Sequence, residues 1–236
     1  MSRVFAIASA ELSVLCRAPA TWVLWAVFLF AAGYGFATSP ATHLETSIRG
    51  ALSWVLFALM FLVPAVAARL ITREFEEGTI ELTLTAPVGD LEVVAGKYLA
   101  GLALAGGWLL STLPLPVMLA LYGNPEWGLI ATGYLAIGLV AALFLAVATL
   151  GAVLAANQAL GFVLGAGFIL AVWFSGAALA LVPAIPPEAR AALSLANQFD
   201  ELTSGIVDLR AIVLPVSLSA VALFLAVRVI ETRRWL

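Results

Sequence analysis

The chain has 236 residues, of which 64% are hydrophobic and 11% are charged, with a formal net charge of -3. Soluble domains are about 45–50% apolar and about 25% charged. A chain this apolar could not cover its surface with polar groups, so the composition excludes a soluble protein and predicts a membrane protein. The single cysteine, Cys16, excludes an internal disulfide framework, and the single histidine, His43, argues against metal or triad chemistry based on histidine.

Residues 3–17, "RVFAIASAELSVLCR", precede the first apolar run and have the spacing of an amphipathic helix. Their apolar residues recur on one helical face: Phe5, Ala8, Leu12 and Leu15. Such a helix lies along a membrane surface, and Pro19 ends it where the first span begins. Glu11 precedes an apolar run of about 18 residues, longer than the about 7–15 of a signal peptide. We therefore interpret residues 1–18 as an interfacial helix and not as a signal sequence.

Six apolar stretches are long enough to cross a bilayer, for which a helix needs about 20 residues at about 1.5 Å each. They lie near 20–38, 51–69, 98–122, 128–155, 159–182 and 211–230. Pro64 in the second stretch, and Pro114 and Pro116 in the third, can kink their helices. The sequence therefore predicts an all-α integral membrane protein, a single transmembrane domain over residues 1–236 with six transmembrane helices.

Lysine and arginine side chains favour the cytoplasmic side of a membrane. If both termini lie inside, that side carries eight of the eleven basic residues: Arg3, Arg17, Arg69, Arg73, Lys97, Arg228, Arg233 and Arg234. The outer side then carries only Arg49, Arg190 and Arg210. This asymmetry predicts a multi-pass protein with cytoplasmic N- and C-termini and with residues 71–97 as its large cytoplasmic loop.

The segment "ITREFEEGTIELTLTAPVGD", residues 71–90, holds five of the fourteen acidic residues of this otherwise apolar chain. As a helix it has an apolar stripe and a carboxylate stripe, and the second is formed by Glu74, Glu77 and Glu81. Arg73 is placed to pair with Glu77 four residues later. Asp90 is predicted as the N-cap of the helix that follows.

The residues alone leave two interpretations of this acidic segment open. Its carboxylates suit a basic groove on a soluble partner and are poor neighbours for anionic lipid headgroups. The alternative is a solvated surface helix whose charges only mark the cytoplasmic side of the membrane.

The segment 183–210 is too polar to span a membrane and too regularly patterned for a plain loop. After two consecutive prolines, apolar residues recur at helical spacing: Phe199, Leu202, Ile206 and Leu209. We predict two short amphipathic helices on the outer face that re-enter the membrane, where non-helical backbone must be covered by protein or line a wet cavity. In the first outer loop, His43 and Arg49 are expected to be solvated.

Two short motifs lie at the start of the fifth span. Gly161 and Gly165, spaced as G-x-x-x-G, permit close helix packing, either within the bundle or against a second subunit. Asn157 and Gln158 occupy the predicted inner turn before this span. We expect them either to contact a partner or to cap helix ends.

Residues 73–101, "REFEEGTIELTLTAPVGDLEVVAGKYLAG", resemble the signature cytoplasmic segment of ABC-2-type transporter permeases, the membrane subunits of ATP-binding-cassette exporters. They are most similar to the gliding-motility-type permeases, whose loop has an acidic pair, Gly-Thr-hydrophobe-Glu, a proline turn and Gly-Lys-hydrophobe. Further segments resemble that subgroup in the same order, over nearly the whole chain: "GNPEWG" (123–128), Asn157-Gln158, "NQFDELTSGIVDLR" (197–210) and "ETRRW" (231–235). Ala155-Ala156 departs from the usual polar residues of the inner turn, so little is transferred to that turn.

The resemblance implies an ABC-2 exporter-type fold. The helix in 71–90 would be the coupling helix that docks on the ATP-binding subunit, the N-terminal helix would be a connecting helix beside it, and 183–210 would form the outer re-entrant helices. The docking residues would be Arg73, Glu74, Glu76, Glu77, Gly78, Thr79, Glu81, Pro87 and Asp90. In this role the glutamates bias docking electrostatically, Gly78 allows close backbone approach, and the turn at Pro87 sets the angle to the third span.

Catalytic motifs are absent from the sequence. No G-x-x-x-x-G-K-[ST] phosphate loop occurs, so ATP and Mg would be bound by a partner chain, and this chain is expected to bind no cofactor and to be no enzyme. An intramembrane protease using Glu76 and Glu77 would need histidines or a metal, and His43 is predicted on the opposite side. The spans carry almost no interior charge, which argues against an ion-coupled carrier.

We therefore predict a permease subunit that couples ATP hydrolysis by a separate subunit to substrate export across the inner membrane of a bacterium or archaeon. Its predicted partners are two ATP-binding subunits, a second permease subunit and the lipid bilayer, with no nucleic acid. The alternative is a non-transporting mechanotransmission or scaffold subunit of an envelope or motility complex. A continuous cavity between paired permease subunits, wide enough for a solute, would distinguish the two.

Overall fold

A computed structural model describes the chain over residues 3–38, 48–76, 89–122, 125–181 and 186–233. Every regular element within these ranges is a helix: α1 (Arg3–Arg17), α2 (Pro19–Thr38), α3 (Arg49–Glu76), α5 (Asp90–Leu110), α6 (Pro114–Tyr122), α7 (Trp127–Leu154), α8 (Gln158–Trp173), α9 (Ser175–Ala180), α10 (Pro187–Leu193), α11 (Leu195–Thr203) and α12 (Leu209–Arg233). Inside a bilayer a helix satisfies its own backbone N–H and C=O groups. The predicted all-α class is confirmed.

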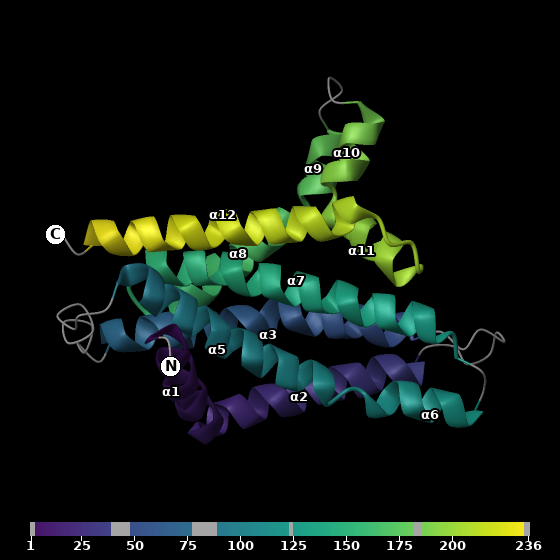
Figure 1. The fold of residues 1–236 in the computed structure, drawn as a ribbon, viewed down its shortest axis with the longest axis horizontal. Coiled ribbons are helices and arrows are strands. Elements are labelled where there is room, and N and C mark those ends of the chain that lie inside the picture. Colours follow the sequence, from purple (N-terminus) through teal and green to yellow (C-terminus); the bar gives the residue numbers. More distant parts are fainter. Residues whose placement is uncertain (1–2, 39–47, 77–88, 123–124, 182–185, 234–236) are drawn as a thin grey trace.

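The long helices lie side by side along one axis, and α1 crosses them steeply (Figure 1). We call one end of this bundle the terminal end, because it holds α1, the last turn of α12, the last turn of α3 and the first turn of α5. The opposite, far end holds the start of α3, the start of α7 and α11. Both described ends of the chain therefore lie at the same end of the bundle.

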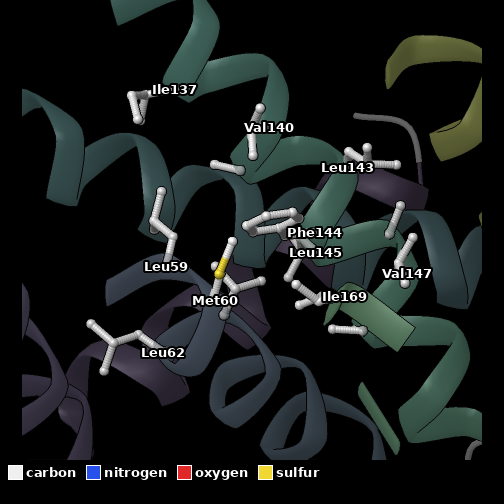
Figure 2. Close-up of a cluster of buried hydrophobic side chains, with 14 of the residues drawn as sticks. Leu59, Met60, Leu62, Ile137, Val140, Leu143, Phe144, Leu145, Val147 and Ile169 are labelled. Atoms are coloured by element: carbon white, nitrogen blue, oxygen red, sulfur yellow. The ribbon is translucent and has the colours of Figure 1, made fainter. Parts of the chain in front are cut away.

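α7 is the centre of the bundle and packs against α3, α5, α8, α11 and α12. It is apolar on all sides, as a surrounded helix is. In α3 and α7, 72% of the residues in the most apolar window are buried, against 22–28% in the other three long spans. Figure 2 shows this core, in which Ile137, Leu143 and Phe144 of α7 lie among side chains of α3 and α8 such as Leu59 and Ile169.

Five segments of the described chain are long and apolar enough to cross a membrane: Pro19–Thr38, Arg49–Arg73, Asp90–Leu121, Trp127–Leu154 and Leu209–Thr232. The expectation of one continuous helix over 159–182 is wrong, because Phe174 separates α8 from α9. α8 has 16 residues, which is about 24 Å and shorter than the about 30 Å of a hydrocarbon core. The chain still runs from the terminal end towards the far end along α8 (Figure 1).

Gly176 allows α9, the short helix after the break, to pack closely on the segment that follows α10. A Cβ atom on Gly176 would lie 2.6 Å from Cβ of Ser194, so the junction of α10 and α11 lies against the bare backbone of α9. α9 and α10 pack together as a pair that projects sideways from the bundle (Figure 1). Trp173, at the end of α8, makes edge-to-face contacts with Phe144 of α7 and Phe199 of α11, which fix the position of the break.

Pro114, which was expected to kink the third predicted span, interrupts its helix. α5 ends at Leu110 and α6 begins at Pro114, because proline has no N–H to donate to the carbonyl of Leu110. The break is held from α7, where the hydroxyl of Tyr134 donates to the carbonyl of Thr112 at 3.1 Å. Pro64 lies inside α3 without interrupting it.

The segment 183–210 contains two short helices, α10 and α11. The predicted apolar series does not continue beyond Leu202, because Gly205 ends α11 with a φ of 83°. The N–H of Ile206 donates to the carbonyl of Glu201 at 3.0 Å. This is a Schellman motif, which needs the left-handed conformation that glycine adopts without strain. Ile206 is therefore turned out of the helix and is exposed.

Arg49 joins the start of α3 to the end of α11. Its Nε donates to the carbonyl of Thr203 at 3.0 Å, and its Nη2 donates to the hydroxyl of Ser204. The cation thus lies at the partly negative C-terminus of a helix, where it is stabilising. The expectation that Arg49 is merely solvated is wrong, since this side chain fastens two elements at the far end.

Candidate functional site

The predicted docking loop, residues 71–97, includes the last turns of α3 and the first turns of α5, which lie at the terminal end (Figure 1). α3 continues without a break to Glu76, so the backbone of Arg73, Glu74 and Glu76 is helical. Arg73 is exposed, whereas the two residues before it are buried. The other predicted docking residues within the loop lie outside the described residues: Glu77, Gly78, Thr79, Glu81 and Pro87.

The N-terminus of α5 is capped one residue earlier than predicted. Gly89 is the N-cap, and Asp90 is the first helical residue. The carboxylate of Glu92 accepts the N–H of Gly89 at 3.0 Å, as the third residue of a helix does in a capping box. Aspartate is a common N-cap, but the Asp90 carboxylate instead lies in the first turn, where the helix dipole favours it.

α1 lies against the first turns of α5. Gly96 makes this approach possible, because a Cβ atom there would lie 2.6 Å from Ile7 Cγ2 and 3.2 Å from the carbonyl oxygen of Val4. Leu15 of α1 is buried, whereas Phe5 is 63% exposed. α1 thus packs one side on the bundle and leaves apolar surface free, which suits the predicted interfacial helix.

Lys97, the only lysine of the chain, is 4% exposed. Its Nζ donates to Glu11 Oε1 of α1 and to the carbonyl oxygen of Leu70 in α3, both at 2.7 Å. A buried charge is costly unless it is paired and hydrogen-bonded, so these contacts hold α1, α3 and α5 together. From the sequence, Lys97 was expected only to be one of the cytoplasmic charges. The signal for its pairing was Glu11, the single acidic residue of the amphipathic helix over residues 3–17.

The residues after Lys97 fix α5 to α7 and α3. The hydroxyl of Tyr98 donates to the carbonyl of Ala142 at 3.1 Å. A Cβ atom on Gly101 would lie 2.9 Å from Leu145 Cδ2 and 3.3 Å from Leu70 Cδ1. The first turns of α5 are therefore in close contact with three helices, α1, α3 and α7.

Gly161 and Gly165 lie in a close seam between α8, α7 and α3. A Cβ atom on Gly165 would lie 3.2 Å from Pro64 Cβ, and one on Gly151 would lie 2.6 Å from the backbone nitrogen of Gly165. A Cβ atom on Gly161 would lie 3.1 Å from Thr72 Cγ2. The two glycines thus pack within one chain, where small residues bring membrane helices close together.

Asn157 caps α8 at the terminal end. Its Oδ1 accepts the N–H of Leu160 at 2.8 Å, which satisfies one of the N–H groups that have no partner in the first turn of a helix. Gln158 is the first residue of α8 and is exposed. The contacts of Asn157 are those of a cap, and Gln158 lies at the accessible surface.

The described site is an assembly of packed helices with one buried ion pair. Over the part of the chain that the structure describes, no group of three or more His, Cys, Asp or Glu side chains could hold a metal ion. The contacts join the helices on both sides of the acidic loop to α1 and to the central helix α7. This arrangement suits the transmission of a displacement through the bundle.

A comparison with protein-family models matches residues 5–227 to the family described as ABC-2 family transporter protein. The match covers nearly the whole chain. The chain belongs to the ABC-2 family of transporter proteins. It is therefore a multi-pass membrane protein and a permease subunit of an ABC transporter. Permeases of this family work with an ABC ATPase subunit. The predicted permease is confirmed. No curated protein matches this ABC-2 transporter protein.

Proposed function

We propose that this ABC-2 permease couples ATP hydrolysis by a separate ATPase subunit to the export of a substrate, and that residues 71–97 are the docking site. The observation that carries the proposal is the placement of this loop between α3 and α5. Both helices pack against the central α7, and α3 is among the most buried helices of the bundle. A force on the loop would therefore act directly on the core.

The acidic loop also has the charge that such a docking surface needs. Glu74, Glu76, Glu77 and Glu81 would favour a basic surface on the ATPase, and complementary charge speeds and orients association. Arg73 is exposed beside them. The sequence of this loop resembles the gliding-motility-type permeases more than any other part of the chain does, and this resemblance supports the same role.

The terminal end is proposed to face the cytoplasm, where ATP is available, with the protein in the inner membrane of a bacterium or archaeon. Among the described basic residues, only Arg49, Arg190 and Arg210 lie away from this end. This is the distribution that the positive-inside preference produces.

Two ATPase subunits would bind ATP and Mg²⁺, and a second permease subunit, identical or different, would complete the transporter. This chain itself would bind no cofactor. ATP-driven closure of the ATPase pair would draw the two docking loops together and shift the membrane halves between inward- and outward-facing states.

The substrate is proposed to be amphipathic or apolar, because the spans carry almost no interior charge. The surface agrees with this: a groove of about 210 Å³ between α2 and α3 has a wholly apolar lining. Its aromatic residues are in contact from one helix to the other, and they include Tyr34, Trp54 and Phe57. Transport of a small, strongly charged substrate would contradict this part of the proposal.

Charge reversal in the loop tests the docking role. We expect Glu77→Arg with Glu81→Arg to lower about tenfold or more both the amount of ATPase chain that co-purifies and the ATP hydrolysis of the complex, since charge pairs across an interface contribute about 1.5 kcal/mol or more each. Glu188→Arg with Glu201→Arg makes the same charge change at two exposed positions away from the terminal end and should match the wild type.

Unchanged association and hydrolysis in the loop variant would show that the docking role is wrong. A complex that hydrolyses ATP but has no continuous cavity between its permease subunits would favour a non-transporting, mechanotransmission role instead.

A further inference from the structure

Lys97 is the only charged residue that is buried among the described side chains. We propose that it is a positioning residue, which fastens α1, the last turns of α3 and the start of α5 into one unit, so that the acidic loop cannot move without α1. This inference rests on the proposed function of residues 71–97 and goes beyond it by naming the contact that carries the movement to α1.

On the α3 side, Lys97 holds the backbone and not only a side chain. Its Nζ donates to the carbonyl oxygen of Leu70 at 2.7 Å, and Leu70 lies six residues before the described end of α3 at Glu76. A carbonyl oxygen has two lone pairs, so it can accept this bond in addition to the bond of the helix. The Leu70 side chain also lies against Gly101 of α5. The last turns of α3 are therefore fixed to α5 through one residue.

On the α1 side, a charge-assisted bond and close backbone packing act at the same place. Glu11 Oε1 lies 2.7 Å from Lys97 Nζ, and the Glu11 side chain is itself only 21% exposed. The neighbouring Gly96 lies directly under Ile7 of α1. α1 packs on α5 more extensively than on α2, so a shift of the start of α5 acts directly on α1.

A buried charge at position 97 calls for an explanation, because an apolar side chain could fill the same space without the cost of removing a charge from water. Replacing a buried ion pair by well-packed apolar groups is often neutral or stabilising, and buried polar contacts can instead select one arrangement of helices. The pairing of Lys97 with two helices at once gives it such a geometric role. The other described ion pairs at the terminal end are more exposed: Arg3–Glu92, which joins α1 to α5 with a longer distance of 3.8 Å, and Arg228–Glu231, which lies within one helix.

The test measures the distance between α1 and α5 in the complex with its ATPase. In a Cys16→Ser background, spin labels at Ser13 of α1 and Leu91 of α5, both exposed, report this distance by pulsed electron resonance in lipid nanodiscs. We expect the wild type to give the same distance without nucleotide and with ATP plus vanadate. In Lys97→Met we expect the distance to differ between the two states and its distribution to broaden about twofold.

Three variants separate positioning from loss of structure. Lys97→Arg keeps the charge and should restore the constant distance, and Arg228→Met, which removes the exposed pair at the same end, should behave as the wild type. If Lys97→Met does not accumulate, Glu11→Gln removes the partner's charge, leaves an oxygen to accept from Lys97, and should show the same dependence on nucleotide in weaker form.

A distance in Lys97→Met, or in Glu11→Gln if that variant replaces it, that stays constant between nucleotide states would overturn the inference alone. A wild-type chain that does not co-purify with an ATPase would overturn the proposed function, and with it the inference.

Discussion

Gly96 gives a sharp test of the packing of α1 on α5. Replacing it by alanine adds one carbon atom, which would lie 2.6 Å from Ile7 Cγ2 and 3.2 Å from the carbonyl oxygen of Val4. The Ile7 side chain can rotate, but the backbone of Val4 can give way only if α1 moves. Overpacking of this kind costs roughly 1–3 kcal/mol, so Gly96→Ala should destabilise the protein by that amount relative to the same change in open space.

Gly106, in the same helix, is the matched control. A Cβ atom there would meet nothing within 4 Å, and alanine is favoured over glycine inside a helix by about 0.5–1 kcal/mol. Because both positions lie inside α5 and share this gain, the same substitution at Gly96 and at Gly106 should give free energies of unfolding that differ by the overpacking cost alone, about 1–3 kcal/mol.

Unfolding by SDS titration in mixed micelles measures both free energies. A double-mutant cycle with Ile7→Ala adds a direct test, because it removes the contact of the new methyl group with Ile7 Cγ2 and so relieves part of the overlap, while Cβ of residue 7 stays 2.8 Å away. We expect a coupling free energy between Ile7 and Gly96 of about 1 kcal/mol or more, as residues in contact show. If Gly96→Ala is as stable as Gly106→Ala and the cycle shows no coupling, α1 does not pack on α5 through Gly96.

Three further substitutions test the fold in the same unfolding assay. Gly165→Ala places a methyl group against Pro64 and should cost roughly 1–3 kcal/mol. Gly167→Ala, whose new methyl group meets nothing within 4 Å, should be neutral or stabilising. Equal stabilities of the two variants would contradict the seam of α3, α7 and α8. Asn157→Ala removes the cap of α8 and should cost about 0.5–2 kcal/mol, and Asn157→Ser should recover most of this; no difference between the two would refute the cap. Arg49→Met removes the hydrogen bonds to Thr203 and Ser204. It should lower the free energy of unfolding by about 1–3 kcal/mol and speed hydrogen exchange in α11. Unchanged exchange would show that Arg49 does not hold α11.

The periodicity and hydropathy of the sequence predict most helices and spans, because these elements depend on residues that are close together in the sequence. The apolar spacing of residues 3–17 matches the bounds of α1, and five of the six predicted spans correspond to long apolar helical segments. Pro114 was recognisable as a break because a missing N–H acts on its own helix. The resemblance to ABC-2-type permeases was carried mainly by residues 73–101 and 197–210, and the family match extends over residues 5–227.

The features that the sequence did not predict depend on contacts between distant elements. The break after α8 lies beside a contact between Ser194 and Gly176 that hydropathy does not contain. The role of Arg49 depends on a carbonyl group 154 residues away, and the pairing of Lys97 with Glu11 joins residues 86 positions apart. Such pairs become visible only when the helices that carry them are placed together.

Two helix ends were also predicted at the wrong residue, because neighbouring residues favour different end positions. Asp90 and Gly89 are both acceptable N-caps, and the carboxylate of Glu92 selects the position by accepting the N–H of Gly89. The apolar series of 199–209 predicts a longer helix than exists, because the left-handed conformation of Gly205 ends α11.

The measurement that tests the central claim most directly is a site-specific cross-link from the acidic loop. A photoreactive amino acid at Arg73, which is exposed at the end of α3, should form a covalent adduct with an ATP-binding chain in native membranes. The same residue at Arg210, exposed at the start of α12, should form none. Adducts with the ATPase from position 210, or none from position 73 in a complex that hydrolyses ATP, would contradict the assignment of residues 71–97 as the docking site.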